Sequence, residues 1–227
     1  MINKGGAAIA VNGKNFLIKD NDISSFTYNA IAVGGARDSG VVNISGRIVG
    51  NLIDNSEYYG IKWGQLDDAG GIYIWAHTDG VVIEDNIVRN LGYEECDIWG
   101  IYLDNGAYNC IVRRNLVYNM WPGEYASYSR YVEECERSNI NNVFENNILI
   151  GPCRIEGNRR GLGEKTIIRN NYIAGDLDTK GNEYVCLEGN KFISATISKD
   201  GKIVFKKGEK VKKRGFTCRI KKMIKRH

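Results

Sequence analysis

The sequence predicts an all-β protein built as a parallel β-helix solenoid of about seven coils, and two repeated features support this prediction. The first is a short apolar phrase around a central asparagine, which returns at intervals of roughly 20–40 residues with no helical pattern between its copies. The six copies that keep the asparagine are 18–23, 83–88, 112–117, 144–149, 168–173 and 187–192. A seventh copy, 44–49, places Arg47 at the asparagine position.

The steps between the central positions are uneven. The positions are 21, 47, 86, 115, 147, 171 and 190, so the steps are 26, 39, 29, 32, 24 and 19 residues. Helical and leucine-rich repeats are more regular, whereas a parallel β-helix keeps its strands and lets its turns vary. Asparagine tolerates the left-handed backbone region and forms local hydrogen bonds. Stacked once per coil, these side chains are also expected to form an amide ladder.

The second repeated feature is a strand of alternating character that precedes the phrase. Residues 71–75 read Gly-Ile-Tyr-Ile-Trp and residues 100–104 read Gly-Ile-Tyr-Leu-Asp, and each strand begins 15 residues before its asparagine. Alternate side chains of a strand point to opposite faces. The set expected to fill the interior is Ile72, Ile74, Ile101 and Leu103. The set expected to line an outer face is Tyr73, Trp75, Tyr102 and Asp104.

The chain divides into a solenoid domain, 1–195, and a C-terminal segment, 196–227. Residues 196–205 are predicted to form a β-hairpin around Asp200-Gly201. Residues 202–227 contain 12 Lys or Arg and one acid, a net charge of +11, whereas the remainder has 19 basic and 26 acidic residues, a net charge of −7. Two interpretations of this basic tail stay open: a solvated tail, or a contact surface for an anionic polymer, a membrane or nucleic acid.

Size and composition limit the class of protein. With 227 residues and 43% apolar residues, the chain is large enough for one solenoid core. A stretch of about 18 apolar residues, which a transmembrane helix requires, does not occur. Residues 1–20 lack the pattern of a secretory signal. Because residues 6–11 already fit a strand inside a coil, we expect either a monomer or part of a longer protein.

The cysteine pattern argues against a metal cofactor. The six cysteines are isolated, without a CxxC motif or paired histidines, so a zinc site is not expected. Cys110 lies in an apolar strand and is expected to pack as a small hydrophobic residue. We therefore expect no cofactor.

Counting back from the asparagines arranges polar residues in columns. Eleven positions before the asparagine, successive coils carry Trp75, Asp104, Glu136 and Arg160. Thirteen positions before it, they carry Tyr73, Tyr102, Glu134 and Asn158. Eighteen positions before it, two coils carry Asp68 and Asp97. Neighbouring coils stack at roughly 4.8 Å, so the column pairs Asp68–Asp97 and Asp104–Glu136 would approach the separation of about 5–5.5 Å that retaining glycosidases use.

Aromatic residues on the same face predict contact with sugar rings. The candidate substrate-binding residues are Trp63, Tyr73, Trp75, His77, Trp99, Tyr102, Glu136 and Arg160. Residues 51–67 do not fit a coil and are interpreted as an excursion that carries Trp63 over this face. Alternative interpretations stay open: the aromatic residues pack as ordinary strand residues, and Asp68 and Asp97 cap turns or belong to a calcium-binding cluster.

Two phrases on this face resemble those of a known family. Asp-Ala-Gly-Gly-Ile-Tyr at 68–73 and Trp-Gly-Ile-Tyr-Leu-Asp-Asn-Gly at 99–106 resemble the pectate-lyase-like, right-handed parallel β-helix proteins. The likeness is strongest to their glycoside hydrolase branches, which include xylosidase- and fucosidase/xylanase-type enzymes, and it covers 5–195. The resemblance implies a pair of acidic catalysts at Asp68 and Asp104. Such enzymes are usually longer, with further N-terminal coils and accessory β domains, and are exported.

Three functions follow as hypotheses. The leading one is hydrolysis of glycosidic bonds in a polysaccharide or oligosaccharide by two carboxylates, with Asp68 ranked first, Asp104 second and Asp97 third. The second is a polysaccharide lyase or epimerase, which requires calcium or another cation and a basic residue to remove a proton. The third is a non-catalytic glycan-binding or structural solenoid.

Overall fold

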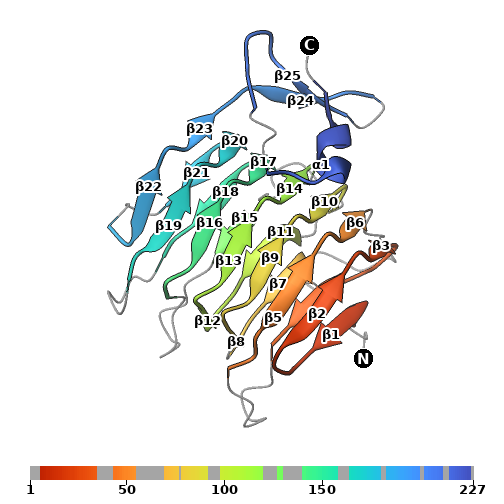
Figure 1. Cartoon of the computed structure of the whole chain (residues 1–227), viewed down its shortest axis with the longest axis vertical. Helices are drawn as coiled ribbons and strands as arrows, with labels where there is room; N and C mark the ends of the chain where they lie inside the picture. Colours follow the sequence, from red (N-terminus) through yellow and green to blue (C-terminus); the bar gives the residue numbers. More distant parts are fainter. Residues whose placement is uncertain are drawn as a thin grey trace.

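The fold is all-β and consists mainly of long parallel sheets, as the computed structural model shows (Figure 1). The structure describes residues 6–34, 43–54, 69–76, 78–91, 98–119, 127–129, 140–157, 164–179, 183–199, 202–211 and 215–225. Within these residues, no helix is long and apolar enough to cross a membrane.

Three parallel sheets of seven strands each form most of the described chain. The first sheet contains β1 (Ile9–Val11), β4 (Ile31–Val33), β7 (Ala69–Ile74), β11 (Ile98–Leu103), β15 (Ser127–Ser129), β18 (Cys153–Ile155) and β21 (Leu177–Asp178). The second sheet contains β2 (Phe16–Lys19), β5 (Gly46–Val49), β9 (Val82–Glu84), β13 (Ile111–Arg113), β16 (Val143–Glu145), β19 (Thr166–Arg169) and β22 (Val185–Glu188). The third sheet contains β3 (Asp22–Ser24), β6 (Leu52–Asp54), β10 (Ile87–Arg89), β14 (Leu116–Tyr118), β17 (Ile148–Ile150), β20 (Tyr172–Ala174) and β23 (Lys191–Phe192).

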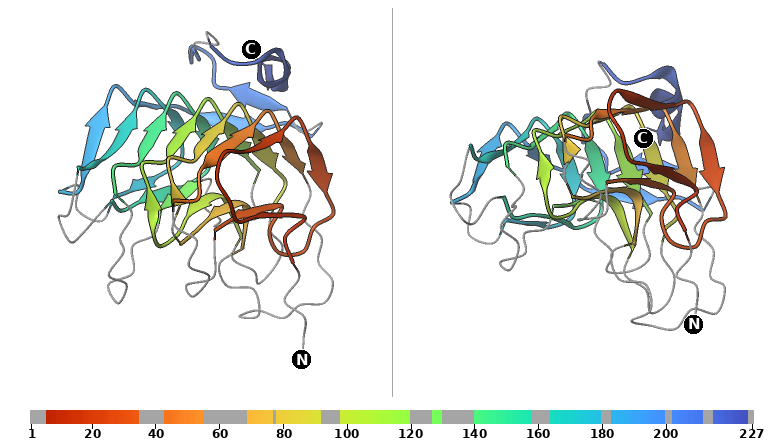
Figure 2. Two further views of the ribbon diagram at one scale, coloured as in Figure 1. Left: turned by 60° about the horizontal axis from the view of Figure 1, so that its bottom comes forward. Right: turned by 90° about the horizontal axis from the view of Figure 1, so that it is seen from below.

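The order of these strands gives the chain a β-helix-like winding. The chain passes from the first sheet to the second and the third and then returns to the first, one strand further along (Figure 2). A two-stranded parallel sheet, β8 (Thr78–Asp79) and β12 (Ala107–Tyr108), lies between the first and second sheets in chain order. This winding stacks equivalent positions of successive passes, so a sequence repeat becomes a column in space.

Aliphatic side chains from alternate strand positions fill the interior, as the sequence pattern predicts. Ile72, Ile74, Ile101 and Leu103 are fully buried in the main hydrophobic core. Cys110 belongs to the same core, and burial raises the pKa of its thiol to about 12. The predicted inward set and the packing of Cys110 are therefore confirmed.

An asparagine ladder joins the passes along the turn between the second and third sheets. Each backbone N–H and side-chain Nδ2 donates to Oδ1 of the next asparagine at 2.8–3.1 Å. From the second member onward, Nδ2 also donates to a main-chain carbonyl of the preceding pass. The members are Asn21, Asn51, Asn86, Asn115, Asn147, Asn171 and Asn190. The predicted ladder is confirmed.

One member of the ladder corrects the sequence alignment. Arg47 was predicted to take the asparagine position, but it pairs with Leu17 in the β2–β5 register, four residues before Asn21. The ladder position belongs to Asn51. The steps around it are therefore 30 and 35 residues rather than 26 and 39. Residues 44–49 have the same apolar spacing as the repeated phrase, but they lie on the strand that precedes the ladder position.

The left-handed backbone conformation lies one residue before each ladder asparagine. Positive φ occurs at Asp20, Gly50, Asp85, Arg114, Asn146, Asn170 and Gly189. Asparagine at the repeat is therefore selected for its side-chain hydrogen bonds, while the preceding residue makes the turn. The expectation that the ladder asparagine itself adopts this conformation is wrong.

The second sheet carries a column of alternating charge on its outer face. The register aligns Glu84, Arg113, Glu145, Arg169 and Glu188 on successive strands. Nε of Arg113 lies 2.7 Å from Glu84, and Nη2 of Arg169 lies 2.7 Å from Glu145. Opposite charges at each step replace the repulsion that a column of like charges would create.

The C-terminal segment covers the outer face of the third sheet. It forms an antiparallel hairpin of β24 (Ala195–Ile197) and β25 (Ile203–Phe205), a short helix α1 (Cys218–Met223) and β26 (Ile224–Lys225), which pairs with β25 (Figure 1). The predicted hairpin is confirmed. Phe216, Ile220 and Ile224 are buried in a second hydrophobic cluster that includes Leu116 and Ile148 of the third sheet.

The basic segment 202–227 is therefore not a freely solvated tail in the part that the structure describes, because its apolar residues pack on the third sheet while its described lysines, such as Lys207 and Lys222, stay exposed. The basic residues of α1 alternate with apolar ones, and Arg219 donates to Asp22 of β3 at 2.5 Å. The net charge of this region does not reveal its apolar residues, which attach it to the third sheet.

Replacing Phe216 by alanine is expected to lower the free energy of unfolding by about 3–5 kcal/mol, because the buried ring leaves a cavity. Chemical denaturation measures the change. Phe192→Ala is the matched control, since its ring is 64% exposed and its removal leaves no cavity. Equal destabilisation by the two variants would contradict the described packing of the C-terminal segment.

Candidate functional site

An aromatic cluster lies on the outer face of the first sheet. Tyr73 and Tyr102 occupy paired positions of β7 and β11, with ring centroids 5.3 Å apart. Trp99 lies 4.5 Å from Tyr102 between ring centroids, and Trp75 stacks beside Tyr73 at 6.4 Å. This cluster is separate from the main core. The predicted outward orientation of the two tyrosines is confirmed.

The four rings differ in their access to solvent. Tyr102 is fully buried and Tyr73 is 8% exposed, so both pack mainly against protein. Trp75 and Trp99 are partly exposed. The tryptophans are therefore the rings of this cluster that remain available to a bound molecule.

Asp104 adjoins the cluster. It directly follows β11, and its backbone N–H donates to the carbonyl of Ile74 at 2.7 Å, which extends the pairing of β7 and β11 by one residue. The side chain is only 6% exposed, and the hydroxyl of Tyr73 donates to its Oδ2 at 2.8 Å. A buried carboxylate needs such a donor, and this bond holds Asp104 in a defined orientation.

Gly34 provides the space that Trp75 occupies. It follows β4 with a φ of +154°, and a Cβ atom at this position would collide with the indole ring of Trp75. Backbone pairing continues here, because the N–H of Trp75 donates to Val33 O at 2.9 Å. The indole thus lies over the backbone of the neighbouring pass.

The strand register changes the predicted columns beyond Asp104. Tyr128 of β15 pairs with Tyr102, and Arg154 of β18 pairs with Tyr128. These residues stand where counting from the asparagines placed Glu134 and Asn158. Tyr102 precedes its asparagine by 13 residues, Tyr128 by 19 and Arg154 by 17. The count from the asparagines fails because these passes have additional residues between the first sheet and the ladder. Such residues lengthen the connection without changing which strands pair.

The same correction removes Glu136 and Arg160 from the column of Trp75 and Asp104. The positions that follow β15 and β18 in equivalent register are 130 and 156. Position 156 is Glu156, a carboxylic acid that is 6% exposed. Thr179, which is 9% exposed, directly follows β21 but stands in register with Ile155, and the position that would align with Glu156 lies outside the described residues.

Glu156 is the residue that sequence reasoning missed. It follows β18 directly, as Asp104 follows β11, and β15 separates the two strands. Two strand spacings of roughly 4.8 Å place their backbones about 10 Å apart. The signal that would have identified Glu156 is the strand Cys153–Ile155, whose match to the repeat is short.

The remaining predicted site residues lie outside the described part of the chain. They are Trp63, Asp68, His77, Asp97, Glu136 and Arg160. Asp68 and Asp97 directly precede Ala69 and Ile98, which are paired in the β7–β11 register. The roles predicted for these six residues stay predictions.

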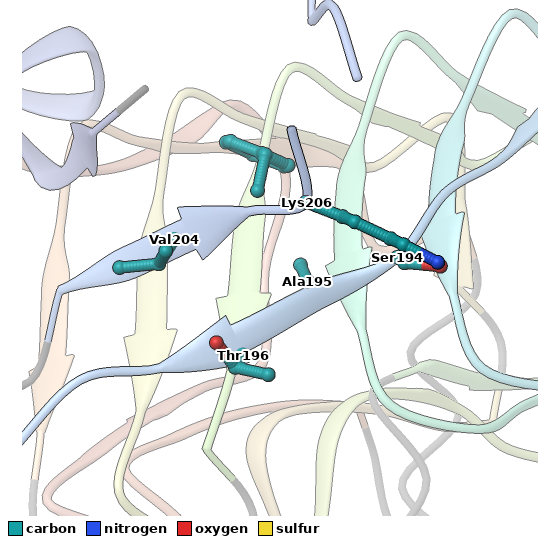
Figure 3. A pocket seen from close by; sticks show the side chains of 6 residues that line it. Ser194, Ala195, Thr196, Val204 and Lys206 are labelled. Carbon is teal, nitrogen blue, oxygen red and sulfur yellow. The ribbon is translucent and has the colours of Figure 1, made fainter. Parts of the chain in front are cut away.

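The described residues contain no group of three or more His, Cys, Asp or Glu side chains arranged to hold a metal ion. A pocket of about 250 Å³ lies instead at the C-terminal hairpin, lined by 194–196 and 204–206 (Figure 3). Among the described residues that line it, Lys206 is the only charged one. Because no carboxylate occurs among these described lining residues, we do not assign glycosidase chemistry to this pocket.

Comparison with known proteins identifies no family. No family model matches the sequence, and no curated protein matches it. Among solved structures, the chain resembles the protein described as "Crystal structure of Agl-KA catalytic domain", with 15% identity and a TM-score of 0.39. The match covers 83% of this chain and 42% of the other. At this identity and score, the likeness supports no argument about function.

Proposed function

We propose that this chain is a right-handed parallel β-helix of about seven coils that hydrolyses glycosidic bonds in a polysaccharide or oligosaccharide, with Asp104 and Glu156 as its two carboxylates. Connections between parallel strands of one sheet are right-handed in nearly all proteins. The observation that carries the proposal is a pair of buried acids, each directly after a strand of the first sheet, beside partly exposed tryptophans.

The spacing of the two acids favours an inverting reaction. Inverting glycosidases hold their carboxyl groups about 6.5–9.5 Å apart, which leaves room for a water molecule between the second carboxylate and the sugar. Backbones about 10 Å apart allow side chains to reach this range. One carboxyl group donates a proton to the glycosidic oxygen, and the other removes a proton from the attacking water.

The aromatic residues supply binding and orientation. Trp75 and Trp99 offer flat apolar surfaces against which sugar rings stack. Tyr73 acts as a positioning residue, because its hydroxyl holds Oδ2 of Asp104 at 2.8 Å. Arg154, which stands two residues before Glu156 on β18, donates to Asp178 at 3.2 Å and adds polar character to this face of the sheet.

Asp68 and Asp97 form a second candidate pair. The residues after them, Ala69 and Ile98, are paired across β7 and β11, where neighbouring strands stand roughly 4.8 Å apart. That spacing matches a retaining mechanism. Trp63 and His77 belong to the proposal as substrate-binding residues on grounds of sequence alone. Glu136 and Arg160 were predicted from a column count that the strand register does not support, so they carry no part of it.

Neutralising either acid tests the proposal. Asp104→Asn and Glu156→Gln are each expected to lower kcat/KM for a cleaved glycan by about 10²–10⁴-fold, the contribution of a positioned general acid or base. Release of reducing ends from a panel of plant and microbial glycans measures this. Asp176→Asn is the control, since this acid is exposed and lies outside the column.

Three results would contradict the proposal. Full activity of both neutral variants would remove Asp104 and Glu156 from the mechanism. Glycan binding without any product would support a non-catalytic solenoid. An unsaturated product that absorbs ultraviolet light and requires calcium would support a lyase. Melting temperatures of the variants distinguish lost chemistry from lost folding.

A further inference from the structure

The two ends of the solenoid present open strand edges. Among the described residues, no strand pairs with the outer edges of β1, β2 and β3 at one end or of β21, β22 and β23 at the other. The C-terminal segment lies over the third sheet rather than across the last pass (Figures 1 and 2). Open edges of this kind are templates for pairing with another chain.

In the described part of the chain, the exposed large hydrophobic side chains lie on the first and last passes. The large hydrophobic side chains exposed in the described chain are Leu17 at 60%, Leu187 at 47% and Phe192 at 64%. Leu17 is on β2 of the first pass, whereas Leu187 and Phe192 are on β22 and β23 of the last. Leu187 and Phe192 pair with Ile168 and Ile173, which are buried core residues, so they continue two core columns into solvent.

The asparagine ladder has complementary ends. Every member donates toward the next, so the final member, Asn190, presents its backbone N–H and Nδ2 toward the open end. The first member, Asn21, donates to Asn51, and its own Oδ1 accepts no hydrogen bond from the described residues. The ladder thus ends in hydrogen-bond donors at Asn190 and in an acceptor at Asn21.

The charges at the two ends are complementary in the same register. The alternating column on the second sheet ends at Glu188, and its first position is occupied by Lys19. On the third sheet, Lys191 stands at the end of the column that begins with Asp22. The side chains of Lys19 and Asp22 are 55% and 71% exposed, although Lys19 lies 3.5 Å from Asp20 and Asp22 accepts a hydrogen bond from Arg219.

We propose that the last pass of one molecule stacks on the first pass of a second copy, head to tail, and continues the ladder and the strand columns between molecules. Asn190 then donates to Asn21 of the next copy, Glu188 meets Lys19, Lys191 meets Asp22, and Leu187 and Phe192 are buried. Because the two surfaces differ, the contact is heterologous and repeats without closing, so it produces open filaments.

A charge exchange tests this interface. Sedimentation velocity at low salt is expected to show a weight-average mass for the full chain that rises with concentration beyond two copies of its 25.4 kDa. Lys19→Glu and Glu188→Lys each place like charges face to face and are expected to weaken assembly at least about tenfold. The double variant restores opposite charges and is expected to assemble again.

Two further variants keep the test decisive. Lys207→Glu changes the net charge as Lys19→Glu does but lies in an exposed turn of the C-terminal segment, so it is expected to assemble like the wild type. Phe192→Asp is expected to abolish assembly without unfolding the monomer. The proposal is overturned if the wild type stays at the mass of one chain, if Lys207→Glu weakens assembly as Lys19→Glu does, or if growth stops at dimers, which would indicate contact between like ends.

Discussion

Replacing Asn115 by leucine is expected to lower the free energy of unfolding by about 3–6 kcal/mol, because the change leaves several buried polar groups without partners. Oδ1 of Asn115 accepts two hydrogen bonds from Asn86, and its Nδ2 donates to the carbonyl of Ile83 and to Oδ1 of Asn147. Leucine has a similar volume but removes all four bonds. Each buried group left unsatisfied costs about 1–3 kcal/mol.

The first member of the ladder provides the matched control. Asn21→Leu removes only donated side-chain bonds at an accessible end, since its backbone N–H still reaches Oδ1 of Asn51. This variant is expected to lose about 1 kcal/mol. Denaturant unfolding at low protein concentration measures both changes. A loss at Asn115 no larger than that at Asn21 would show that the ladder contributes little to stability.

Acid is expected to weaken the fold through Glu84. Burial alone raises the pKa of this carboxyl group. Hydrogen bonds from Arg47, Arg113 and Arg114 lower it by more than burial raises it, so the pKa is about 2 instead of 4.5. A carboxyl group whose pKa is lower in the folded than in the unfolded state stabilises the folded state at pH values above its unfolded-state pKa. This stabilisation is therefore complete above about pH 4.5 and is lost as the pH falls toward 2, and it amounts to about 3 kcal/mol.

Glu84→Gln separates this contribution from that of other acids. The variant leaves three arginines without their shared carboxylate, whose side chain is 1% exposed, and is expected to be about 3–5 kcal/mol less stable at pH 7. Between pH 4.5 and 2, its stability is expected to approach that of the wild type. Glu164→Gln, at an exposed position, is expected to follow the wild type throughout. A constant difference between Glu84→Gln and wild type across this pH range would contradict the assignment.

The repeated phrase predicted the sheets well because it contains the residues that hold them together. Asn86 and Asn115 stand at the repeat because an amide is the side chain that both donates and accepts along a ladder. The inward alternation at Ile72 and Ile101 follows from the two-residue period of a strand. Both features are local and therefore visible in one sequence.

Prediction failed where the spacing between strands varies. Arg47 was placed on the ladder because the preceding turn shifts the apolar pattern by four residues relative to Asn51. Glu156 was missed because the turn between β18 and the next ladder asparagine is longer than that of the pass containing Asp104. Turn length has no fixed relation to strand pairing, so only the register locates such residues.

The C-terminal segment was misinterpreted for a different reason. Its twelve basic residues leave two interpretations open, a solvated tail or a contact surface for an anionic partner, yet Phe216 and Ile220 bury the outer face of the third sheet. That face carries apolar residues such as Leu116 and Ile148, and the sequence alone does not distinguish them from residues of the main core. Which element covers a face depends on tertiary contacts that a repeat does not encode.

The anomeric configuration of the first sugar product tests the central claim most directly. Asp104 and Glu156, two strand spacings apart, predict inversion at the cleaved carbon. Proton NMR of a reaction in progress, before mutarotation, distinguishes the two anomers. An inverted product supports the Asp104–Glu156 pair. A retained product would contradict it and favour carboxylates one strand spacing apart, as Asp68 and Asp97 are predicted to be.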